Sequence, residues 1–580
     1  MNKIKSICLI FSLLPALLYA TSVGTDFFVC YPANACREPV SIPAPPDSHF
    51  NGQIIITSTS PATGIVRNED SSFCVPFSVP AYSVITISID STHWIRESDT
   101  VVQKGLRIQS DNPISVFFLS YEAPSALNDI ALIYPVPSLG TDYITMCWRD
   151  NLPTYPIGFP TPVPYDRGPS MFAIVAPYDS THIEITTPVA TEGGHPAGVP
   201  WSIVLNSYDC YQVLANTPII TDLYDLTGSV ITSDKPIAVL SGNQLAFVPD
   251  SIMAADYLIE QMPPLTAWGT TFNLFPIQPR NYWGKDVIKI LASEDGTNIT
   301  IEDSSGTTPV ILNRGESFEW NGQPCNEGSY LPFVGYAADC DGKLLDSPTR
   351  ITSDKPILIG QFITGGNLTR GVPDSLTGLG DDPLGDPAFM LVPPVEQYAH
   401  QYVFLTPSGY NNDFVNIAIL AGYEASVMVD GGAPVLSTPW FDIPTMTYRG
   451  ARISLDPGAH VIEADTNIML QMYGYDENWA SYATVVAQNL DTVSLGIFIN
   501  RVFPEEIDLF INPNPFNSFV SISAPKEANI EIFDMLGKLV VRMKGGNRVW
   551  KPEASVGSGI YLVRARVGDK EVTKRVVYLK

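Results

Sequence analysis

The sequence has few charged residues, few of them basic, and no helical or membrane-spanning pattern after its first twenty residues. Only 16% of its 580 residues are charged, with 33 Lys and Arg against 60 Asp and Glu. The formal net charge of −27 removes nucleic acid from the expected partners, because nucleic-acid binding needs a basic face. No segment beyond the N-terminus is apolar for long enough to cross a membrane. We therefore expect a soluble mature chain outside the cytoplasm, without a transmembrane segment.

The sequence also lacks the short motifs that carry common enzyme chemistry. It contains six His, none in an H-E-x-x-H motif, and it has no G-x-S-x-G or P-loop pattern. No C-x-x-C pair is present, which argues against a zinc ribbon. Because 60 acidic residues form many chance pairs, no glycosidase carboxylate pair can be nominated. We expect no catalytic residue, no cofactor and no enzyme activity.

The abundant residues favour short strands joined by turns. The chain is 45% hydrophobic and contains 50 Pro, 42 Gly, 26 Phe and 26 Tyr. Aromatic residues are enriched in strands, whereas Pro and Gly mark turns. The composition predicts an all-β fold.

The first twenty residues are typical of an export signal. Lys3 and Lys5 precede an apolar core at Ile7–Leu18, and Ala20 or Ser22 offers a small residue for cleavage. We assign residues 1–20 as a signal peptide. The apolar core is too short to span a membrane.

Cysteine pairing is plausible if the chain is exported. After the signal, seven cysteines remain, so at least one is free or paired between chains: Cys30, Cys36, Cys74, Cys147, Cys210, Cys325 and Cys340. Cys325 with Cys340 is the first candidate pair because it closes a short loop. Further candidates are Cys147 with Cys210, and Cys30 or Cys36 with Cys74.

One seven-residue phrase, Ile-Thr-Ser-Asp-Lys-Pro-Ile, occurs twice without change, at Ile231–Ile237 and Ile351–Ile357. Looser copies stand at Ile108–Ile114 and Ile462–Ile468. Ile and Thr favour strands, Ser and Asp can close a turn, and Pro can begin the next strand. The phrase predicts a repeated strand–turn–strand hairpin, with a ligand-binding Asp loop as the alternative.

Self-similarity around this phrase divides the chain into four units of about eight strands each. The predicted units cover residues 24–128, 129–255, 256–385 and 386–490. Each can form one two-sheet sandwich or two four-stranded propeller blades. Stacked β-sandwiches and a propeller-like ring of double blades therefore remain open, although closed or tightly stacked units are favoured because no Gly/Ser linker separates the copies.

Composition changes after the fourth unit. Residues 491–504 are the predicted linker, and residues 505–580 form a basic segment. From Asn517 onward it holds twelve Lys and Arg against six Asp and Glu. Its short apolar runs predict a small Ig-like β-sandwich.

Several polar residues are weak candidates for a binding site. His93 and Trp94 could line a sugar-binding pocket. The alternative is that the two residues are packed against other aromatic side chains. His182 and Glu184 lie two residues apart, so both face the same side of a strand. Exposed aromatic residues could stack on sugars or pack between units: Trp94, Trp148, Trp268, Trp283 and Trp479.

Two acidic loops partly resemble calcium loops, which collect several oxygen ligands in a short turn. The first contains Asp339, Asp341 and Asp346, and the second is Gly380–Asp386. Both lack the closing Glu of an EF-hand, so calcium is a weak expectation and a solvated turn is the alternative.

The repeated body resembles the N-terminal domain of the IgGFc-binding protein family. The likeness covers most of residues 24–490 and is carried by these segments: Gly24–Phe28, Leu139–Tyr143, Ala176–Thr181 and Gly228–Ile237. The resemblance implies a secreted binding or adhesion module. It does not imply that this chain binds IgG.

The last segment resembles the type A C-terminal sorting domain of type IX secretion cargo. The likeness is carried by Asn512–Asn517, Ile530–Lys538, Ser558–Arg564 and the basic end, with these sorting-signal residues: Pro513, Asn514, Pro515, Gly537, Gly559, Tyr561 and Lys574. The resemblance implies the type IX machinery as a partner, with release or surface anchoring on the outer membrane of a Gram-negative bacterium. An ordinary terminal Ig-like domain is the alternative.

Together these observations predict an exported, non-enzymatic β-repeat protein that binds a glycan, a mucin-like polymer or a protein. A secreted hydrolase with a propeller or sandwich body is the second hypothesis. A structural surface-layer component is the third. Converging carboxylates at one cleft would favour the hydrolase, and ordered self-assembly would favour the surface layer.

Overall fold

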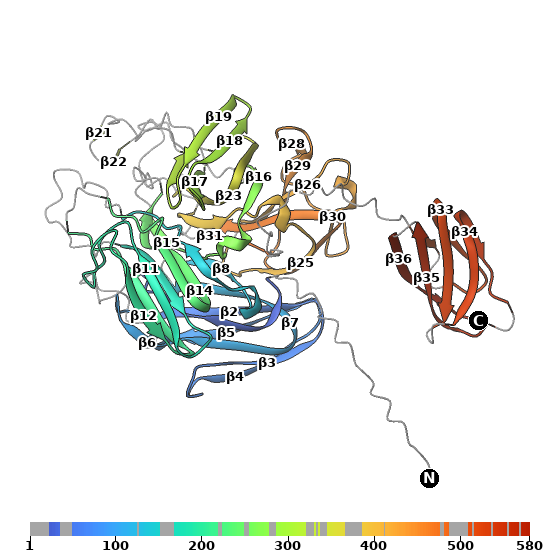
Figure 1. Ribbon diagram of the computed structural model, residues 1–580, viewed down its shortest axis with the longest axis horizontal. Coiled ribbons are helices and arrows are strands. Elements are labelled where there is room, and N and C mark those ends of the chain that lie inside the picture. Colours follow the sequence, from blue (N-terminus) through green and yellow to red (C-terminus); the bar gives the residue numbers. More distant parts are fainter. Residues whose placement is uncertain are drawn as a thin grey trace, which may run out of the picture. The chain divides into compact units, whose positions relative to one another are not determined.

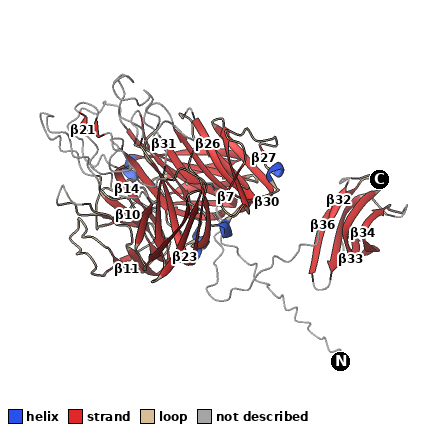
Figure 2. Cartoon of the chain, turned by 90° about the horizontal axis from the view of Figure 1, so that it is seen from above, coloured by secondary structure: helices blue, strands red, loops and turns tan. Residues whose placement is uncertain are grey.

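The computed structural model contains two compact units, Met1–Val493 and Ser494–Lys580 (Figure 1). Apart from five 3-10 turns, the regular structure in its described part is all strand (Figure 2), and no helix there is long and apolar enough to span a membrane. The all-β prediction is confirmed. The predicted signal peptide lies outside the described residues, which are 22–34, 49–123, 127–150, 168–218, 223–248, 255–277, 286–320, 330–331, 335–336, 345–365, 385–410, 412–475, 481–486, 509–512, 516–534, 538–553, 556–567 and 570–580.

The first unit contains four repeats, each ending in one long strand. Repeat 1 comprises β1 (Gly24–Val29), β2 (His49–Ser58), β3 (Ala62–Arg67), β4 (Cys74–Val79), β5 (Ser83–Asp90), η1 (Ser91–His93), β6 (Val101–Gln103) and β7 (Leu106–Ala123). Repeat 2 comprises β8 (Asp129–Ile133), η2 (Val136–Ser138), β9 (Gly140–Ile144), β10 (Ser170–Val175), β11 (Thr181–Thr186), β12 (Trp201–Leu205), β13 (Asp209–Leu214) and β14 (Val230–Phe247).

Repeats 3 and 4 follow the same order. Repeat 3 comprises β15 (Ala255–Gln261), η3 (Leu265–Ala267), β16 (Gly269–Leu274), β17 (Val287–Ala292), β18 (Thr297–Asp303), β19 (Gly306–Leu312), β20 (Ser317–Trp320), β21 (Tyr330–Leu331), β22 (Gly335–Tyr336) and β23 (Thr349–Ile363). Repeat 4 comprises β24 (Ala388–Leu391), η4 (Val395–Gln397), β25 (Ala399–Thr406), β26 (Asn412–Leu420), η5 (Glu424–Ser426), β27 (Met428–Val429), β28 (Phe441–Asp442), β29 (Tyr448–Leu455) and β30 (Gly458–Tyr475), and is followed by β31 (Ser481–Val485).

The long strand of each repeat belongs to two sheets at once. The first half of β14 pairs with β9 and β11, whereas its second half pairs with β10 and β15. The same arrangement holds around β7, β23 and β30. Each repeat is therefore a pair of sheets joined by one continuous strand, which matches a sandwich better than two separate propeller blades.

The repeated phrase is not a hairpin, so that prediction is wrong. Ile231–Ile237 lies inside β14, and the pairing of β14 with β9 shifts register between Thr232 and Ile237. The phrase marks the bend at which the strand passes from one sheet to the other. Ser233 Oγ donates to the carbonyl of Lys235 across the bend at 2.7 Å. The side chain thus satisfies a carbonyl that the interrupted ladder leaves without an amide.

The Asp of the phrase also has a structural role. The carboxylate of Asp234 accepts from the backbone amide of His182 at 2.8 Å, and Asp354 accepts from that of Asn298 at 2.8 Å. In repeat 1, Asp111 accepts from the amide of Thr63 at 2.7 Å. In three repeats the acid therefore caps the neighbouring strand, which supports the structural interpretation of the phrase over a ligand-binding loop.

Each long strand also pairs with the strand that follows it in the chain, which for the first three repeats is the first strand of the next repeat. β8 pairs with β7, β15 with β14, β24 with β23, and β31 with β30. These four strands also lie beside one another, β8 against β15 and β31, and β24 against β15 and β31. Figure 1 shows β8, β15 and β31 at the centre of the body. The four repeats thus form a closed ring around a central axis.

The hydrophobic core continues across the seams of this ring. One core cluster joins residues of repeat 4, repeat 1 and repeat 2, and another joins repeats 2 and 3. Between repeats 4 and 1, the hydroxyl of Thr57 donates to the carbonyl of Val403 at 3.0 Å. A repeat removed from its neighbours would expose part of its core, so the ring rather than the repeat is the stable unit.

The second unit is a five-stranded antiparallel sheet around an aromatic core. It comprises β32 (Phe510–Asn512), β33 (Val520–Asp534), β34 (Leu539–Trp550), β35 (Gly559–Val567) and β36 (Lys570–Tyr578). The strand order is β32-β33-β35-β36, with β34 paired to β33. Phe516 contacts Trp550 and Tyr578, with ring centroids 5.4 and 5.0 Å apart. This packing buries the inward side of the sheet.

Candidate functional site

The axis of the ring holds a buried carboxylate that contacts all four inner strands. Asp129 is fully buried, and its carboxylate accepts from four backbone amides. Oδ1 accepts from Ile130 and Ala483 at 3.0 and 3.4 Å, and Oδ2 accepts from Ile259 and Phe389 at 3.1 and 3.2 Å. The four donors come from β8, β31, β15 and β24, one from each strand.

The four donor positions are structurally equivalent. Their partners on the long strands are Leu119, Gly242, Phe362 and Tyr473, each five residues after the last Ile of the repeated phrase. Each inner strand therefore turns the same free amide toward the axis. Asp129 alone fills the centre, because its counterparts on the other strands are Leu258, Ala388 and Tyr482.

A second set of buried side chains satisfies amides above and below Asp129. The carboxylate of Asp256 accepts from the amides of Asn128 and Tyr257, both at 2.7 Å. Gln261 Oε1 accepts from the amide of Tyr134 at 2.9 Å. Two of these contacts join residues of different repeats, and the contact of Asp256 with the Tyr257 amide lies near the start of β15. The axis is thus held by side-chain acceptors where a sheet would use a neighbouring strand.

Glu260 and Thr484 complete this set. The hydroxyl oxygen of Thr484 accepts from the amide of Leu132 at 3.2 Å, and the nearby Thr484 side chain lowers the pKa of Glu260. The backbone of Leu391 also lowers the pKa of Glu260. Residues of three repeats and of β31 therefore lie close together at this level of the axis.

Burial governs the protonation of these acids. Burial raises the pKa of Asp129, and the four amide donors oppose that rise. Burial likewise raises the pKa of Asp256, with the nearby Asp386 adding to the effect, and it raises the pKa of Glu260. Desolvation disfavours the charged form, and hydrogen bonds to that form favour it. Since all of them are inaccessible to solvent, the axis acids fit a scaffold rather than a catalytic site.

A further acid lies next to the axis on β26. Asp413 is buried and accepts from the hydroxyl of Tyr482 at 2.6 Å. Burial raises the pKa of Asp413 to about 6, although the Tyr482 hydroxyl and His460 oppose the shift. Asp413 is therefore the acid of this region whose charge changes in the mildly acidic range.

The seams between repeats carry buried ion pairs. Lys289 of repeat 3 is almost fully buried, and its ammonium lies 2.9 Å from both the Asp225 carboxylate and the Cys147 carbonyl of repeat 2. The corresponding seam between repeats 3 and 4 uses Arg452, whose guanidinium donates to the carbonyl of Pro276 at 2.9 and 2.6 Å. Both cations bind a carbonyl that follows the first outer strand of the preceding repeat.

Asp99 fixes the seam between repeats 1 and 2. It accepts from the amide of Gly193 at 2.8 Å and from the hydroxyl of Thr191 at 3.0 Å. His195 lies 3.8 Å from the same carboxylate and stacks on Trp201 with ring centroids 4.1 Å apart. This His–Trp pair was missed by sequence reasoning, because its partner Asp99 lies almost a hundred residues away in another repeat.

Most of the weak binding candidates have ordinary structural environments. His93 and Trp94 are buried, and His93 packs on Phe73 with centroids 4.9 Å apart. Trp148 and Trp268 are core residues, whereas Trp283 and Trp479 lie outside the described residues. His182 and Glu184 are exposed on one side of β11 as expected, and the described residues contain no cluster of three metal-binding side chains.

The calcium candidates gain no support. Asp339, Asp341 and most of Gly380–Asp386 lie outside the described residues. Asp346 is exposed, and Asp386 is buried beside the axis, where its amide donates to Ser481 at 2.9 Å.

The structure also separates two cysteines that were predicted to pair. Cys147 and Cys210 are both buried free thiols in different core clusters. Cys147 donates to the carbonyl of Met171 at 3.3 Å, while Cys210 points to the opposite side of its sheet. Cys147 and Cys210 are therefore not paired with each other in this structure. A different cysteine lies near Cys210, as described below. Cys325 and Cys340 lie outside the described residues, as does Cys36.

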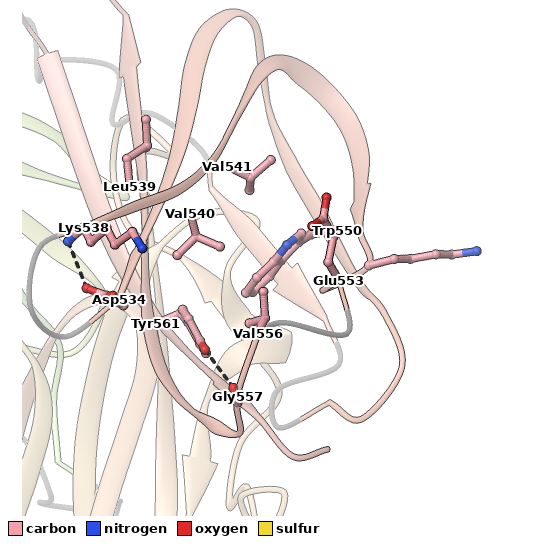
Figure 3. Close-up of a pocket in the computed structure, with 11 residues that line it drawn as sticks. Asp534, Lys538, Leu539, Val540, Val541, Trp550, Glu553, Val556, Gly557 and Tyr561 are labelled. Atoms are coloured by element: carbon pink, nitrogen blue, oxygen red, sulfur yellow. Dashed lines mark hydrogen bonds between the residues drawn. The ribbon is translucent and has the colours of Figure 1, made fainter.

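The second unit contains a pocket of about 460 Å³ beside the start of β35. Its lining includes Trp550, Val556 and Tyr561, with Lys538 and Asp534 at one side (Figure 3). The Tyr561 hydroxyl donates to the carbonyl of Gly557 at 2.7 Å, and the Lys538 amide donates to Asp534 at 2.9 Å. The pocket thus combines an aromatic wall with two acidic and two basic residues, Asp534 and Glu553 with Lys538 and Lys551.

The predicted sorting residues fall in three places. Tyr561 lines the pocket, Gly559 begins β35, and Lys574 is exposed on β36. Pro513, Asn514, Pro515 and Gly537 lie outside the described residues.

Family comparisons identify both units. The family model described as IgGFc binding protein matches residues 129–474, from the start of β8 to the end of the last long strand, and so covers more than half of the chain. The chain belongs to the IgGFc-binding protein family. A second model, described as the secretion system C-terminal sorting domain, matches residues 510–579. The structure adds repeat 1 to the matched body, because β1–β7 have the same topology as the later repeats.

One relative is the human IgGFc-binding protein, 23% identical over 379 residues. The match covers 64% of this chain but only 6% of the relative's length. Among solved structures, a biofilm-associated protein BSP domain is 6% identical with a TM-score of 0.13, covering 80% of this chain and 93% of that one. E. coli alpha-2-macroglobulin is 9% identical with a TM-score of 0.12, covering 97% and 40%. Neither structural likeness carries an argument about fold or function.

Replacing Asp129 with Asn should destabilise the whole ring. The amide nitrogen of Asn cannot accept hydrogen bonds, so two of the four axis amides lose their acceptor. Each unsatisfied buried group costs about 1–3 kcal/mol, so we expect a loss of about 2–6 kcal/mol in the free energy of unfolding, measured in urea. Asp142→Asn, at an exposed position of β9, is the control and should change stability by less than about 0.5 kcal/mol. Equal effects of the two substitutions would refute the role of the axis carboxylate.

Replacing Asp413 with Asn should flatten the pH dependence of stability. The folded pKa of about 6 exceeds the ordinary value of 3.8, so between these values the folded state binds more protons than the unfolded state. The contribution of Asp413 therefore favours folding at pH 4 and declines by up to about 3 kcal/mol as pH rises past 6. Unfolding curves at pH 4.5 and 7.5 should differ less in Asp413→Asn than in the wild type. An unchanged difference would contradict the assignment.

Proposed function

We propose that this chain acts outside the cell as a non-enzymatic binding or adhesion protein after export by the type IX secretion system. The proposal rests on one observation: the same chain contains an IgGFc-binding family body and a secretion sorting domain. The sorting domain indicates export, and the family of the body suggests a binding role. The ligand is a glycan, a mucin-like polymer or a protein.

The construction of the body supports a scaffold for binding. Its axis acids are buried and occupied by backbone amides, so they offer no accessible acid–base pair. Four similar repeats present their outer strands and loops around the ring. Such a ring can hold several copies of a weak site, which raises the apparent affinity for a polymer through multivalency.

The excess of acidic residues in the body makes some classes of ligand less favourable than others. The body, Met1–Val493, carries 20 Lys and Arg against 51 Asp and Glu, whereas Ser494–Lys580 carries 13 against 9. Polyanions are repelled by a surface with this excess of acids. We therefore propose that the ligand is a neutral glycan or a protein with a basic surface, and that heavily sulfated or sialylated polymers bind weakly.

An array of glycans and proteins tests the binding role. The mature full chain should bind a subset of neutral glycans or basic proteins, and should bind sulfated versions of the same glycans less well. Heat-unfolded chain is the control for non-specific adsorption. Absence of binding on both arrays, or turnover of an array substrate, would overturn the proposal; turnover would favour the hydrolase hypothesis instead.

Removal of Ser494–Lys580 tests the export route separately. The truncated chain should accumulate in the periplasm and disappear from the medium and the cell surface, because it lacks the sorting unit. The full chain carrying Asp142→Asn should be exported normally and serves as the control. Normal export of the truncated chain would show that the second unit is not a sorting domain here.

A further inference from the structure

Two buried cysteines meet at the seam between repeats 1 and 2. Cys30 directly follows β1 of repeat 1, and Cys210 lies within β13 of repeat 2, 180 positions later in the sequence. Both are fully buried, and the Cys210 side chain is close enough to Cys30 to raise the pKa of its thiol. The sequence does not predict that these two cysteines are close, because they belong to different repeats.

Contacts on both sides of the cysteines hold the two segments together. Two residues before each cysteine, Phe28 packs against Tyr208 with ring centroids 5.1 Å apart. On the other side, the amide of Ala33 donates to Gln212 Oε1 at 2.7 Å. The segments around Cys30 and Cys210 therefore run alongside each other, with the two thiols between a ring contact and a hydrogen bond.

We propose that Cys30 and Cys210 are joined by a disulfide in the exported protein, which covalently links repeat 1 to repeat 2. The proposal rests on export, since exported proteins pass through an oxidising compartment in which disulfides form and persist. The bridge closes a loop of 180 residues, and cross-links across long loops restrict the unfolded chain most. It also ties the first repeat of the ring to the rest.

The oxidation needs an external electron acceptor, and we assign this role to the disulfide form of a periplasmic thiol–disulfide oxidoreductase. One cysteine thiolate attacks a sulfur of that disulfide, forms a mixed disulfide and releases one thiol of the oxidant. The second cysteine then attacks the mixed disulfide, forms the Cys30–Cys210 bond and releases the other thiol. Two cysteine thiols are oxidised, and the two electrons and two protons are transferred to the oxidant.

The exchange must precede completion of the ring. Both thiols are enclosed in the folded body, and the neighbouring Cys210 side chain together with burial raises the pKa of Cys30. A buried thiol with a raised pKa forms little thiolate and is not reached by another protein. The bridge should therefore form while repeats 1 and 2 are docking, before repeats 3 and 4 enclose them.

Two other cysteines in the described residues provide internal controls. Cys147 is buried like the proposed pair but packs on the opposite side of the repeat 2 sheet, against the carbonyl of Met171. Cys74 is exposed at the start of β4. Neither should be linked to Cys30 or Cys210.

A peptide map tests the bridge directly. Full chain collected from the medium is denatured without reductant, alkylated with iodoacetamide, digested and analysed by mass spectrometry. We expect one cross-linked pair of peptides containing Cys30 and Cys210, with Cys74 and Cys147 not linked to either. Reduction should split the pair into two peptides that together are heavier by two hydrogens. Alkylation of both Cys30 and Cys210, or linkage of either to another cysteine, would overturn the proposal.

Thermal unfolding gives a second test with a matched control. Reductant should lower the unfolding temperature of the wild type and of Cys147→Ser, but leave that of the Cys30→Ser/Cys210→Ser variant unchanged. An equal response of all three proteins would contradict the bridge. If the double variant does not fold, the peptide map of the wild type still decides.

Failure of the bridge can be distinguished from failure of the proposed function. The chain without Ser494–Lys580 should contain the same cross-linked peptides, because the periplasm is already oxidising. Loss of binding on the arrays with an intact bridge would refute the binding role alone. Binding with two alkylated thiols would refute the bridge alone.

Discussion

The closed ring depends on how the free edges of its four inner strands are satisfied. An unpaired strand edge carries amides and carbonyls that need partners, and in this fold four such edges face one another across an axis. The strands converge without pairing directly, so a side chain must replace the missing neighbour. A single carboxylate has enough lone pairs for four donors, and Asp129 uses them on all four strands. At the centre of the ring, one carboxylate thus accepts the amide hydrogen bonds that a neighbouring strand accepts elsewhere in the sheets.

This arrangement explains why similar repeats contain unlike residues at the axis. The centre has room for one acceptor, and the equivalent positions are therefore Leu258, Ala388 and Tyr482 rather than three further acids. Above and below that level the acceptors come from other repeats, such as Asp256 and Gln261. Desolvation of these acids opposes folding, so they are tolerable only because each bonds several amides and because apolar cores surround them. The ring consequently behaves as one cooperative body, unlike an open array in which each repeat contacts only its neighbours.

The sequence was sufficient to predict the all-β class, because strands and turns follow from local composition. It was not sufficient to predict the path of Ile231–Ile237, since Ser, Asp and Pro suit a tight turn and a strand bend equally well. The axis was missed for a related reason: Asp129 follows Leu127 and Asn128 and is locally indistinguishable from a loop acid. One signal was available, namely Asp256, Glu260 and Gln261 in the same short strand as Tyr257, Leu258 and Ile259. Buried polar residues in such a strand require partners from outside it.

The residues at the seams between repeats could not be paired from the sequence, because their partners lie in a different repeat. Lys289, Arg452, Asp99 and Cys30 each act on a neighbouring repeat, so spacing along the chain carries no information about their partners. These residues and the axis fix the positions of the repeats relative to one another. For the proposed binding role, we expect ligand selectivity to reside in the outer strands and loops, where a substitution does not disturb an amide at the axis or a buried ion pair at a seam. A rigid centre with variable outer loops is also how other scaffolds carry binding sites on a conserved framework. On that argument, substitutions that alter ligand choice and substitutions that destabilise the ring should occupy separate parts of the body.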